Sequence, residues 1–295
     1  MDQRDVQIIV ELYRQPFASH STLGRAVGLT GKAVQARLER MTRAHVLNGF
    51  YVMPSAAVFR RHWQVIPFGP LPIEPPLEQL LAVTDVVNVW RGSPRTAMVN
   101  VYSTAPDSPP PPRLAEILSV RSMEVVAPDP PDRFSFAQST LSSLDWRVLD
   151  AMLENPREPL ARLAERSGLT ARTVRRHRDS LWAKGLVSVV PNLDTTGESG
   201  LLVYSGFVVA TQKAYLERVQ APGLQVLQRL HRPPAVWLLG QAGSYAELQE
   251  LEVHLRELPG IVRVDLVPSR GGAMAVARIR SWIRKELDVW KTRYR

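Results

Sequence analysis

The chain has 295 residues, of which 45% are hydrophobic and 22% charged, with a formal net charge of +9 and no cysteine. This length suffices for two or more domains with their own cores, and the hydrophobic share excludes wholesale disorder. The lack of cysteine excludes disulfides and thiolate chemistry, and the positive charge favours polyanionic partners, nucleic acid first and anionic membranes second.

The amino terminus carries acids among its first residues and no long apolar core, so it lacks the pattern of a secretory signal. No stretch of the sequence approaches the run of about eighteen apolar residues that a membrane-spanning helix needs. We therefore expect a soluble, cytoplasmic chain that has no membrane segment.

One stretch occurs twice, as GLTGKAVQARLERMTRAHVL at residues 28–47 and as GLTARTVRRHRDSLWAKGLV at residues 168–187. A constant offset of 140 residues places Thr170 on Thr30. In each copy this threonine is expected to cap a helix by accepting from amides of the first turn. Apolar residues follow at helical spacing, and the positions expected to face outward are cationic: Lys32, Arg37 and Arg40 in the first copy, and Arg172, Arg175, Arg176 and Arg178 in the second.

Two shorter helical segments precede each copy. Residues 5–13 and 145–153 have the apolar spacing of a first helix, and residues 22–27 and 159–167 that of a second helix. Gly28 and Gly168 follow at the points where a tight turn needs positive φ. The β-rich runs 46–53 and 185–190, which come after the third helix, would form a short wing. Three helices and a strand in this order predict a winged helix-turn-helix, whose third helix lies in the DNA major groove.

The remaining segments alternate between strands and helices. Residues 63–126 follow the order βαββαβ of a ferredoxin-like module, with strands at 64–68, 86–90, 96–102 and 123–126 and helices at 76–83 and 113–119. Residues 201–268 give a second such module, with strands at 201–210, 235–239 and 261–268 and helices at 213–230 and 245–258, in which the third strand of the pattern is short or missing.

The sequence therefore predicts an α+β chain, with two winged helix-turn-helix domains alternating with two ferredoxin-like modules, plus a C-terminal helix. The expected boundaries are 1–54 and 141–194 for the helix-turn-helix domains, 63–126 and 201–268 for the modules, 127–140 for a proline-rich linker and 273–295 for a basic amphipathic helix. This last helix has three interpretations: packing on the second module, contact between chains, or contact with an anionic surface through Arg278, Arg280, Arg284 and Lys285.

Each half of the chain resembles a member of the leucine-responsive/asparagine-operon regulator family, Lrp/AsnC. The residues that carry the resemblance are Asp5 and Asp145, the GLT turns with their basic helices, Gly240, and the segment LPGIVRVDLV at 258–267. In this family a winged helix is joined to a ferredoxin-like module that dimerises and binds small effectors, often amino acids. The resemblance implies a transcriptional regulator that binds double-stranded DNA and that needs no cofactor.

Two copies in one chain predict an intramolecular pseudo-dimer. Its two helix-turn-helix domains would meet half-sites about one helical turn, roughly 34 to 36 Å, apart on one duplex. Because the copies have diverged, we expect a non-palindromic site. We also expect the chain to form a homodimer, as the resemblance implies.

The expected DNA contacts come from both third helices. Gln35 and either Arg175 or Arg176 are best placed for bidentate contacts with bases, while Lys32, Arg40 and Arg172 should mostly hold phosphate. The full set is Thr30, Lys32, Gln35, Arg37, Arg40, Thr170, Arg172, Thr173, Arg175, Arg176 and Arg178. Arg178 occupies the position of Leu38, which is expected to face the core, so either its side chain extends past the helix end or the second domain is tilted.

The resemblance also implies an effector site at a glycine turn between the second and third strands of each module. This turn maps onto Gly92 and Ser93 in the first half and onto Gly240, Gln241 and Gly243 in the second. The acidic residue that the family commonly has after this glycine is absent, since Ser93 and Gln241 take its place. The alternative is a module that serves dimerisation alone.

Two further functions compete with a regulator. Siroheme decarboxylases share the two-domain plan, but the stretch VWRGSPRTAMVNVY at 89–102 keeps Arg91 and Arg95 and has no histidine. A nucleoid-type protein that binds DNA with little sequence choice is the other alternative. No catalytic residue and no metal site is expected, because His231 and His254 are isolated and His177 is expected to pack on the inner side of its helix.

Overall fold

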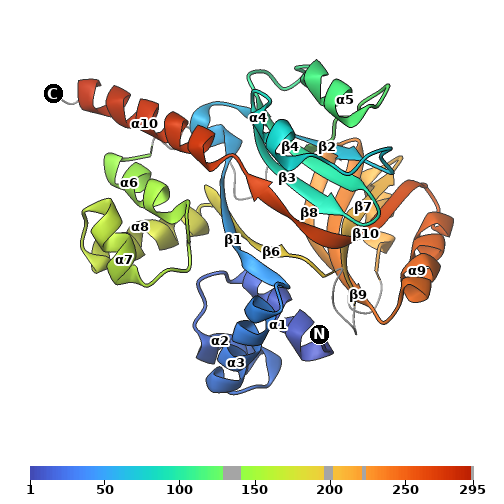
Figure 1. Cartoon of the computed structure of the whole chain (residues 1–295), viewed down its shortest axis with the longest axis horizontal. Coiled ribbons are helices and arrows are strands. Elements are labelled where there is room, and N and C mark those ends of the chain that lie inside the picture. Colours follow the sequence, from blue (N-terminus) through green and yellow to red (C-terminus); the bar gives the residue numbers. More distant parts are fainter. Residues whose placement is uncertain (129–140, 196–201, 221–223, 294–295) are drawn as a thin grey trace.

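The computed structural model describes residues 1–128, 141–195, 202–220 and 224–293 (Figure 1). Most of the expected linker 127–140 and the last two residues of the expected C-terminal helix therefore lie outside the described residues. None of the described helices is long and apolar enough to cross a membrane.

Two three-helix units, called here the first head and the second head, have the expected order. The first head consists of α1 (Gln3–Arg14), α2 (His20–Val27) and α3 (Gly31–Arg43). The second head consists of α6 (Ser143–Met152), α7 (Leu160–Ser167) and α8 (Ala171–Ala183). The apolar positions at helical spacing are buried, among them Val34 in α3 and Val174 in α8, which are both 0% exposed. The heads fold because each helix buries one apolar face.

Equivalent residues of the two heads determine where their helices begin and end. The first helix of each head begins with a capping box, Asp2 with Asp5 in α1 and Ser142 with Asp145 in α6. The second helix of each head ends at a glycine in the left-handed region, with φ of 70° at Gly28 and 63° at Gly168. The predicted turns with positive φ are thus confirmed.

The strands after the two heads pair with each other. β1 (Leu47–Pro54) and β6 (Val187–Leu193) form an antiparallel two-stranded ribbon in which Tyr51 faces Val190. The strands predicted as wings are therefore present, but they pair with each other and not within their own halves. A single strand leaves its backbone N–H and C=O groups without partners, and each half supplies the partner that the other half needs.

The first module has the ferredoxin-like order. It consists of β2 (His62–Phe68) after a 3₁₀ turn at η1 (Ala56–Phe59), then α4 (Leu77–Ala82), β3 (Val86–Gly92), β4 (Thr96–Ser103), α5 (Pro112–Leu118) and the short β5 (Ala127–Pro128). β4 lies between β2 and β3, and Val126 bridges to Val65 on the free side of β2. The helices cover one face, where Leu80, Leu114 and Leu118 are fully buried.

The second module is complete, which corrects the sequence prediction. It consists of β7 (Leu202–Ala210), η2 (Lys213–Arg218), β8 (Gln225–Arg232), β9 (Pro234–Ala242), α9 (Tyr245–Glu257) and β10 (Ile261–Met274). The helix predicted at 213–230 is wrong, because its start is a 3₁₀ turn and its end belongs to β8. β8 is the second strand of the module and 235–239 lies in the third, so the strand that the prediction lacks is the second and not the third. β8 pairs along β9, so the edge of β9 supplies the hydrogen bonds that settle this segment as a strand.

The two modules share one sheet of eight strands in the order β2-β4-β3-β10-β7-β9-β8-β5. β10 pairs with β7 up to Pro268, where the sequence predicted the end of the strand, and with β3 from Ser269 onward. β5 pairs with β8, and the Val65–Val126 bridge next to it returns to β2, so the strands close into a barrel. Apolar side chains from both modules meet inside it, including Val65, Phe207 and Trp237.

The C-terminal helix α10 (Val276–Arg293) leaves the barrel and crosses to the second head (Figure 1). Ile283 is fully buried in the core that α10 shares with α6, and Arg280 Nε bonds to Asp150 at 2.9 Å. Trp282 meets Phe59 and Tyr102 of the first module. Of the three interpretations of this helix, packing is observed, although on the second head and the first module rather than on the second module. The α+β fold class with two winged helix-turn-helix units and two ferredoxin-like modules is confirmed.

Candidate functional site

The third helix of the first head, α3, presents a polar face beyond its cap. The Thr30 hydroxyl accepts from the Ala33 amide at 3.1 Å, which starts the helix. Lys32 and Gln35 are exposed in its first two turns, and Gln35 Nε2 donates to Glu39 at 2.9 Å. This is the part of a helix-turn-helix that meets base edges.

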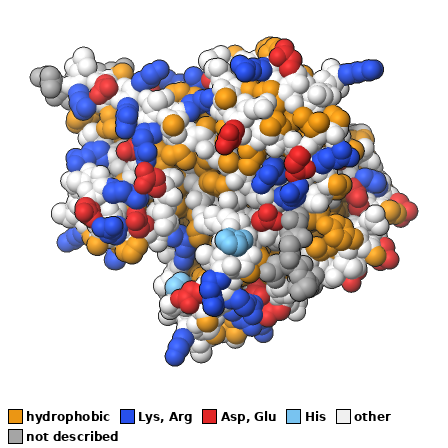
Figure 2. Space-filling view, viewed as in Figure 1, with side chains coloured by type: hydrophobic (Ala, Val, Ile, Leu, Met, Phe, Trp, Pro, Cys, Tyr) orange, Lys and Arg blue, Asp and Glu red, His pale blue; other side chains and the backbone are white. Residues whose placement is uncertain are grey.

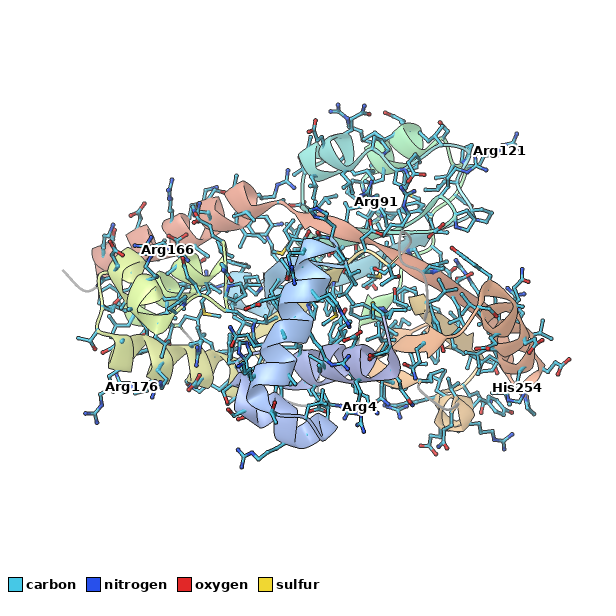
Figure 3. All side chains as sticks on the ribbon, turned by 60° about the horizontal axis from the view of Figure 1, so that its bottom comes forward. Arg4, Arg91, Arg121, Arg166, Arg176 and His254 are labelled. Carbon is cyan, nitrogen blue, oxygen red and sulfur yellow. The ribbon has the colours of Figure 1, made fainter. Side chains whose placement is uncertain are left out.

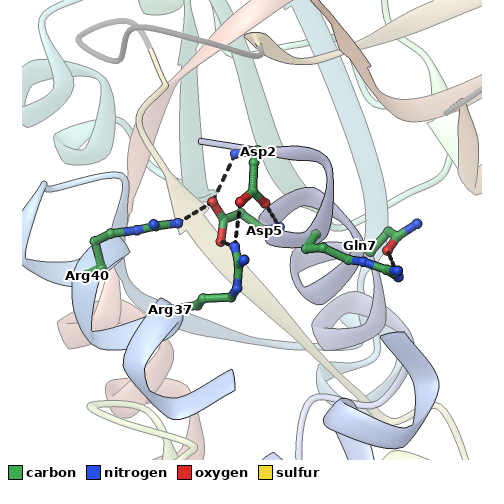
Figure 4. Close-up of polar contacts among 6 residues, drawn as sticks. Asp2, Asp5, Gln7, Arg37 and Arg40 are labelled. Carbon is green, nitrogen blue, oxygen red and sulfur yellow. Dashed lines mark hydrogen bonds and ion pairs between the residues drawn. The ribbon is translucent and has the colours of Figure 1, made fainter. Parts of the chain in front are cut away.

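Two arginines of α3 are bound to acids of α1 (Figure 4). Arg37 Nη1 lies 2.7 Å from Asp2 and 2.9 Å from Asp5, and Arg40 Nη2 lies 2.5 Å from Asp5. The hydrogen bonds to Asp2 and Asp5 raise the pKa of Arg37. Burial works against the charge of Asp2, but Arg37 and the amides nearby hold the pKa of its carboxyl below the usual value. Arg37 therefore faces inward and holds α3 against α1, and the expectation that it faces outward is wrong.

The third helix of the second head, α8, begins in the same way. The Thr170 hydroxyl accepts from the Thr173 amide at 3.2 Å and lies 2.9 Å from the Thr173 hydroxyl. Arg172, Arg175 and Arg176 are exposed on the N-terminal half of the helix. Arg176 points away from the molecule (Figure 3). Lys and Arg side chains lie over both heads, interspersed with acids (Figure 2).

A histidine replaces the inward arginine in the second head. His177 Nδ1 lies 2.6 Å from Asp145, and these positions correspond to Arg37 and Asp5. Burial tends to raise the pKa of Asp145, but hydrogen bonds from His177 and Ser142 hold it below the usual value. His177 is half-buried, as predicted.

Arg178 does not face the outward surface of α8. Its side chain bonds to Asp179, with Nε 3.0 Å from the carboxylate, and its Cζ lies 4.3 Å over the ring of Phe17 in the first head. It therefore extends out of its own head into a contact between the heads. The cations left on the surface of α8 are Arg172, Arg175 and Arg176.

The second candidate site is a cavity of about 320 Å³ where the tips of β3 and β4 meet β7, β10 and α9. Aromatic rings of Trp90, Phe207 and Trp237 line it, together with Arg91 and Thr96. Among the described residues, Arg91 Nε and Thr96 Oγ1 are buried without a hydrogen-bond partner. A buried N–H and a buried hydroxyl that lack partners favour a polar ligand beside an apolar wall.

Four further charged side chains line the cavity from the second module. Arg256 Nη2 donates to Glu252 at 2.6 Å, and Arg263 Nε lies 2.5 Å from Asp265. Burial raises the pKa of Glu252, and Asp265 adds to this effect while Arg256 opposes it. Each acid thus has an arginine of its own module as ion-pair partner, although Asp265 Oδ2 makes no hydrogen bond, whereas Arg91 Nε has no hydrogen-bond partner.

The residues expected for the effector site are separated in the structure. Gly92 lines the cavity, where an added Cβ would meet Val267 at 2.4 Å, and Ser93 follows in the hairpin turn. Gly240 and Gln241 lie within β9, and Gly243 precedes α9; none of the three lines the cavity. The turn that corresponds to Gly92–Ser93 joins β8 to β9 at Pro233, so the expected mapping in the second half is wrong. No local signal identified Trp90, Trp237 or Arg256, because only the joining of the modules brings them together.

The described residues contain no group of three or more acidic, histidine or cysteine side chains that could hold a metal ion.

Comparison with known proteins agrees with the two heads. Residues 1–42 match the AsnC-type helix-turn-helix domain, and residues 141–188 match the winged helix-turn-helix DNA-binding family. No curated protein matches the chain. Among solved structures, it is similar to the siroheme decarboxylase NirDL, with 11% identity over 98% of this chain and 100% of that chain and a TM-score of 0.48.

Two other solved structures are similar. NirDL in complex with an iron-uroporphyrin III analogue has 11% identity over 97% of this chain and 99% of that chain, with a TM-score of 0.46. AsnC from E. coli has 16% identity over 46% of this chain and 98% of that chain, with a TM-score of 0.29. Residues 1–42 thus match an AsnC-type helix-turn-helix and residues 141–188 a winged helix-turn-helix, and in the structure a ferredoxin-like module follows each of them.

Proposed function

We propose that this chain is a cytoplasmic, sequence-specific regulator of transcription that places two reading helices, α3 and α8, on one double-stranded DNA site. The observation that carries the proposal is the pair of capped helices whose exposed N-terminal halves hold polar and cationic side chains, Lys32 and Gln35 in one and Arg172, Arg175 and Arg176 in the other. Base edges are read from this part of such helices.

Selection of bound fragments from random DNA tests this function. A regulator enriches one motif, and its binding to that motif survives roughly a thousandfold excess of random DNA. A nucleoid-type protein enriches no motif, and random DNA competes fully. Enrichment of no motif would therefore exclude sequence-specific regulation.

We also propose that the cavity between the modules binds a small effector that carries a carboxylate and an apolar body, such as an amino acid. The support is the Nε of Arg91 and the hydroxyl of Thr96, both buried without partners, beside the rings of Trp90 and Trp237. A carboxylate would accept from both groups, while the rings would cover its apolar part.

Tryptophan fluorescence tests the effector proposal, because two indole rings line the cavity. Titration of the twenty amino acids one at a time should give a saturable change with at least one of them. Arg91→Ala should weaken that binding by about tenfold or more, the loss of a charge-assisted hydrogen bond. Arg95→Ala is the matched control, because Arg95 lies in the same hairpin and donates to Pro72 outside the cavity. Equal affinities for the two variants would contradict the proposal.

The homodimer that the resemblance implies stays a prediction. Within one chain, β10 pairs with β3 and β5 pairs with β8, so each module already has the other as its partner. Sedimentation of the full chain over a range of concentrations measures whether two chains also associate.

A further inference from the structure

The two heads touch through loops at equivalent positions. Phe17 lies between α1 and α2 of the first head, and Arg157 lies 140 residues further on, between α6 and α7 of the second. The Phe17 ring is 6.1 Å from the ring of Trp182, with an interplanar angle of 81°, and the Arg178 guanidinium lies 4.3 Å over it. Phe17 thus packs on the C-terminal half of α8 in the other head.

Arg157 makes the contact in the opposite direction. Its guanidinium donates to the carbonyl oxygen of Pro16 and, at 3.4 Å, to that of Ala18, on either side of Phe17. Its Cζ lies 5.2 Å over the ring of Phe50 in β1. Burial, together with the nearby charge of Arg178, lowers the pKa of Arg157. The carbonyls and the ring offset the cost of placing a cation there.

The contact depends on differences between the two halves of the chain. At the equivalent positions the first head has Phe17, Leu38 and Thr42, whereas the second has Arg157, Arg178 and Trp182. In a pair of two second heads, Arg157 of one head would lie near Arg157 of the other. Such a pair would also have no aromatic ring under Arg178. Only two different halves can make this pair of contacts, so a fused and diverged chain has a head-to-head connection that identical halves do not.

We propose that these four residues, Phe17, Arg157, Arg178 and Trp182, form a head clamp that fixes α3 relative to α8 and thereby sets the half-site spacing that the chain selects. The clamp covers the C-terminal half of α8 and leaves Arg172, Arg175 and Arg176 exposed. A fixed relation between two reading helices means that only one separation of half-sites fits both. This consequence rests on the proposed function, whereas the fixed placement of the heads does not.

A distance measurement between the heads tests the clamp without DNA. The chain has no cysteine, so Ser21→Cys and Ala161→Cys place nitroxide labels at equivalent exposed positions of α2 and α7. Pulsed electron paramagnetic resonance should give one narrow distance distribution for the full chain. Phe17→Arg should broaden it, because a second cation then faces Arg178. Phe17→Tyr, which keeps the ring, should leave it narrow.

The variants are chosen so that each head keeps its own fold. Arginine occurs at the equivalent position of the second head, and Arg178→Leu installs the residue of the first head. If Phe17→Arg does not fold, Arg178→Leu gives the same test. This variant removes the cation over the Phe17 ring and should also broaden the distance distribution. A distance distribution that is already broad in the parent chain would overturn the clamp. Distributions for Phe17→Arg and Arg178→Leu that are as narrow as that of the parent chain would overturn it too.

A series of DNA duplexes with the selected half-sites at different separations tests the effect on spacing. For the parent chain, affinity should fall about tenfold or more when one or two base pairs are added or removed, whereas for Phe17→Arg it should vary less than about threefold. Equal spacing discrimination in the two proteins would overturn the claim about specificity. If no DNA site is found at all, the proposed function fails, while the distance measurement still decides whether the clamp exists.

Discussion

Arginines of the two reading helices serve different purposes according to what lies opposite them. Arg37 and Arg40 are bound by the acids of α1, and Arg178 lies over Phe17, whereas Arg172, Arg175 and Arg176 remain on the surface. Cationic surface contacts with phosphate dominate affinity and make it depend on salt. Most of the electrostatic DNA affinity of the second head should therefore come from three residues.

Neutralising two of these three tests this assignment. Arg175→Ala with Arg176→Ala should weaken DNA binding and lower the slope of log affinity against log salt by about 2, since each phosphate contact contributes about 0.9. The measurement is the affinity for the selected site at several salt concentrations. Arg113→Ala with Arg121→Ala is the matched control, because it removes the same charge from exposed positions of the first module and should leave the slope unchanged. An unchanged slope in the first variant would contradict the assignment.

The Asp145–His177 pair makes a pH-dependent contribution to stability. The pKa of Asp145 is lowered in the folded chain, so its stabilisation is present above the pKa of the unfolded state, about 3.9, and is lost as pH falls through the lowered value. Asp145→Asn should reduce the free energy of unfolding by about 1.5 to 3 kcal/mol at pH 7, the range for hydrogen bonds to charged groups.

Chemical denaturation of Asp145→Asn and the parent chain between pH 7 and acid pH measures this difference. The two curves should converge as Asp145 becomes protonated. Asp288→Asn, at a position that is 71% exposed, is the control and should change little at any pH. A constant difference that persists at the acid end would contradict the role given to the carboxylate.

At the scale of elements, α10 connects parts that are far apart in the sequence. It buries Ile283 against α6, and its Trp282 ring lies 6.1 Å from Tyr102 and 4.5 Å from the Arg61 guanidinium. The helix therefore holds the second head to the first module. Truncation of the buried side chains of α10 should therefore lower the stability of the helix and of the second head together.

Truncation of one buried side chain tests this connection. Ile283→Ala should lower the free energy of unfolding by about 2 to 5 kcal/mol, the usual cost of removing a buried aliphatic side chain. The neighbouring Arg284→Ala, at an exposed position, should stay within about 0.5 kcal/mol. Urea denaturation followed by circular dichroism gives both values. A small effect of Ile283→Ala would show that α10 does not stabilise the head.

Local patterns in the sequence predicted the elements that local interactions determine. The capped helices α3 and α8, the positive φ of Gly28 and Gly168 and the order of the first module all follow from spacing and turn residues. Residues 225–230 are predicted as part of a helix, because their short mixture of apolar and polar residues fits the period of a helix as well as that of a strand. Only the pairing with the edge of β9 makes them a strand. Long-range pairing decides such segments.

The candidate sites likewise contain residues that local spacing predicts and residues that depend on contacts far apart in the sequence. Gln35, Arg175 and Arg176 could be predicted because the period of a helix fixes which side chains face outward. The inward turn of Arg37 could not, since it depends on Asp5 of another helix 32 residues away. The head clamp had a signal in the sequence: when the halves are compared at the offset of 140 residues, Phe17 stands on Arg157 and Thr42 on Trp182.

At the scale of the whole molecule, the chain is two similar halves joined at three levels. β1 pairs with β6 between the heads and the barrel, the modules share one closed sheet, and the loops around Phe17 and Arg157 join the heads. Figure 1 shows both heads beside the barrel rather than enclosed by it. One chain thus holds the parts that a regulator with a single head would assemble from two chains.

Hydroxyl-radical footprinting on the selected DNA tests most directly whether one chain reads one duplex with both heads. The parent chain should protect two patches about one helical turn apart, at a stoichiometry of one chain per site. Arg175→Ala with Arg176→Ala should remove one patch, and Lys32→Ala with Gln35→Ala should remove the other. A single protected patch would contradict the account. Two patches that need a second chain on the DNA site would contradict it as well.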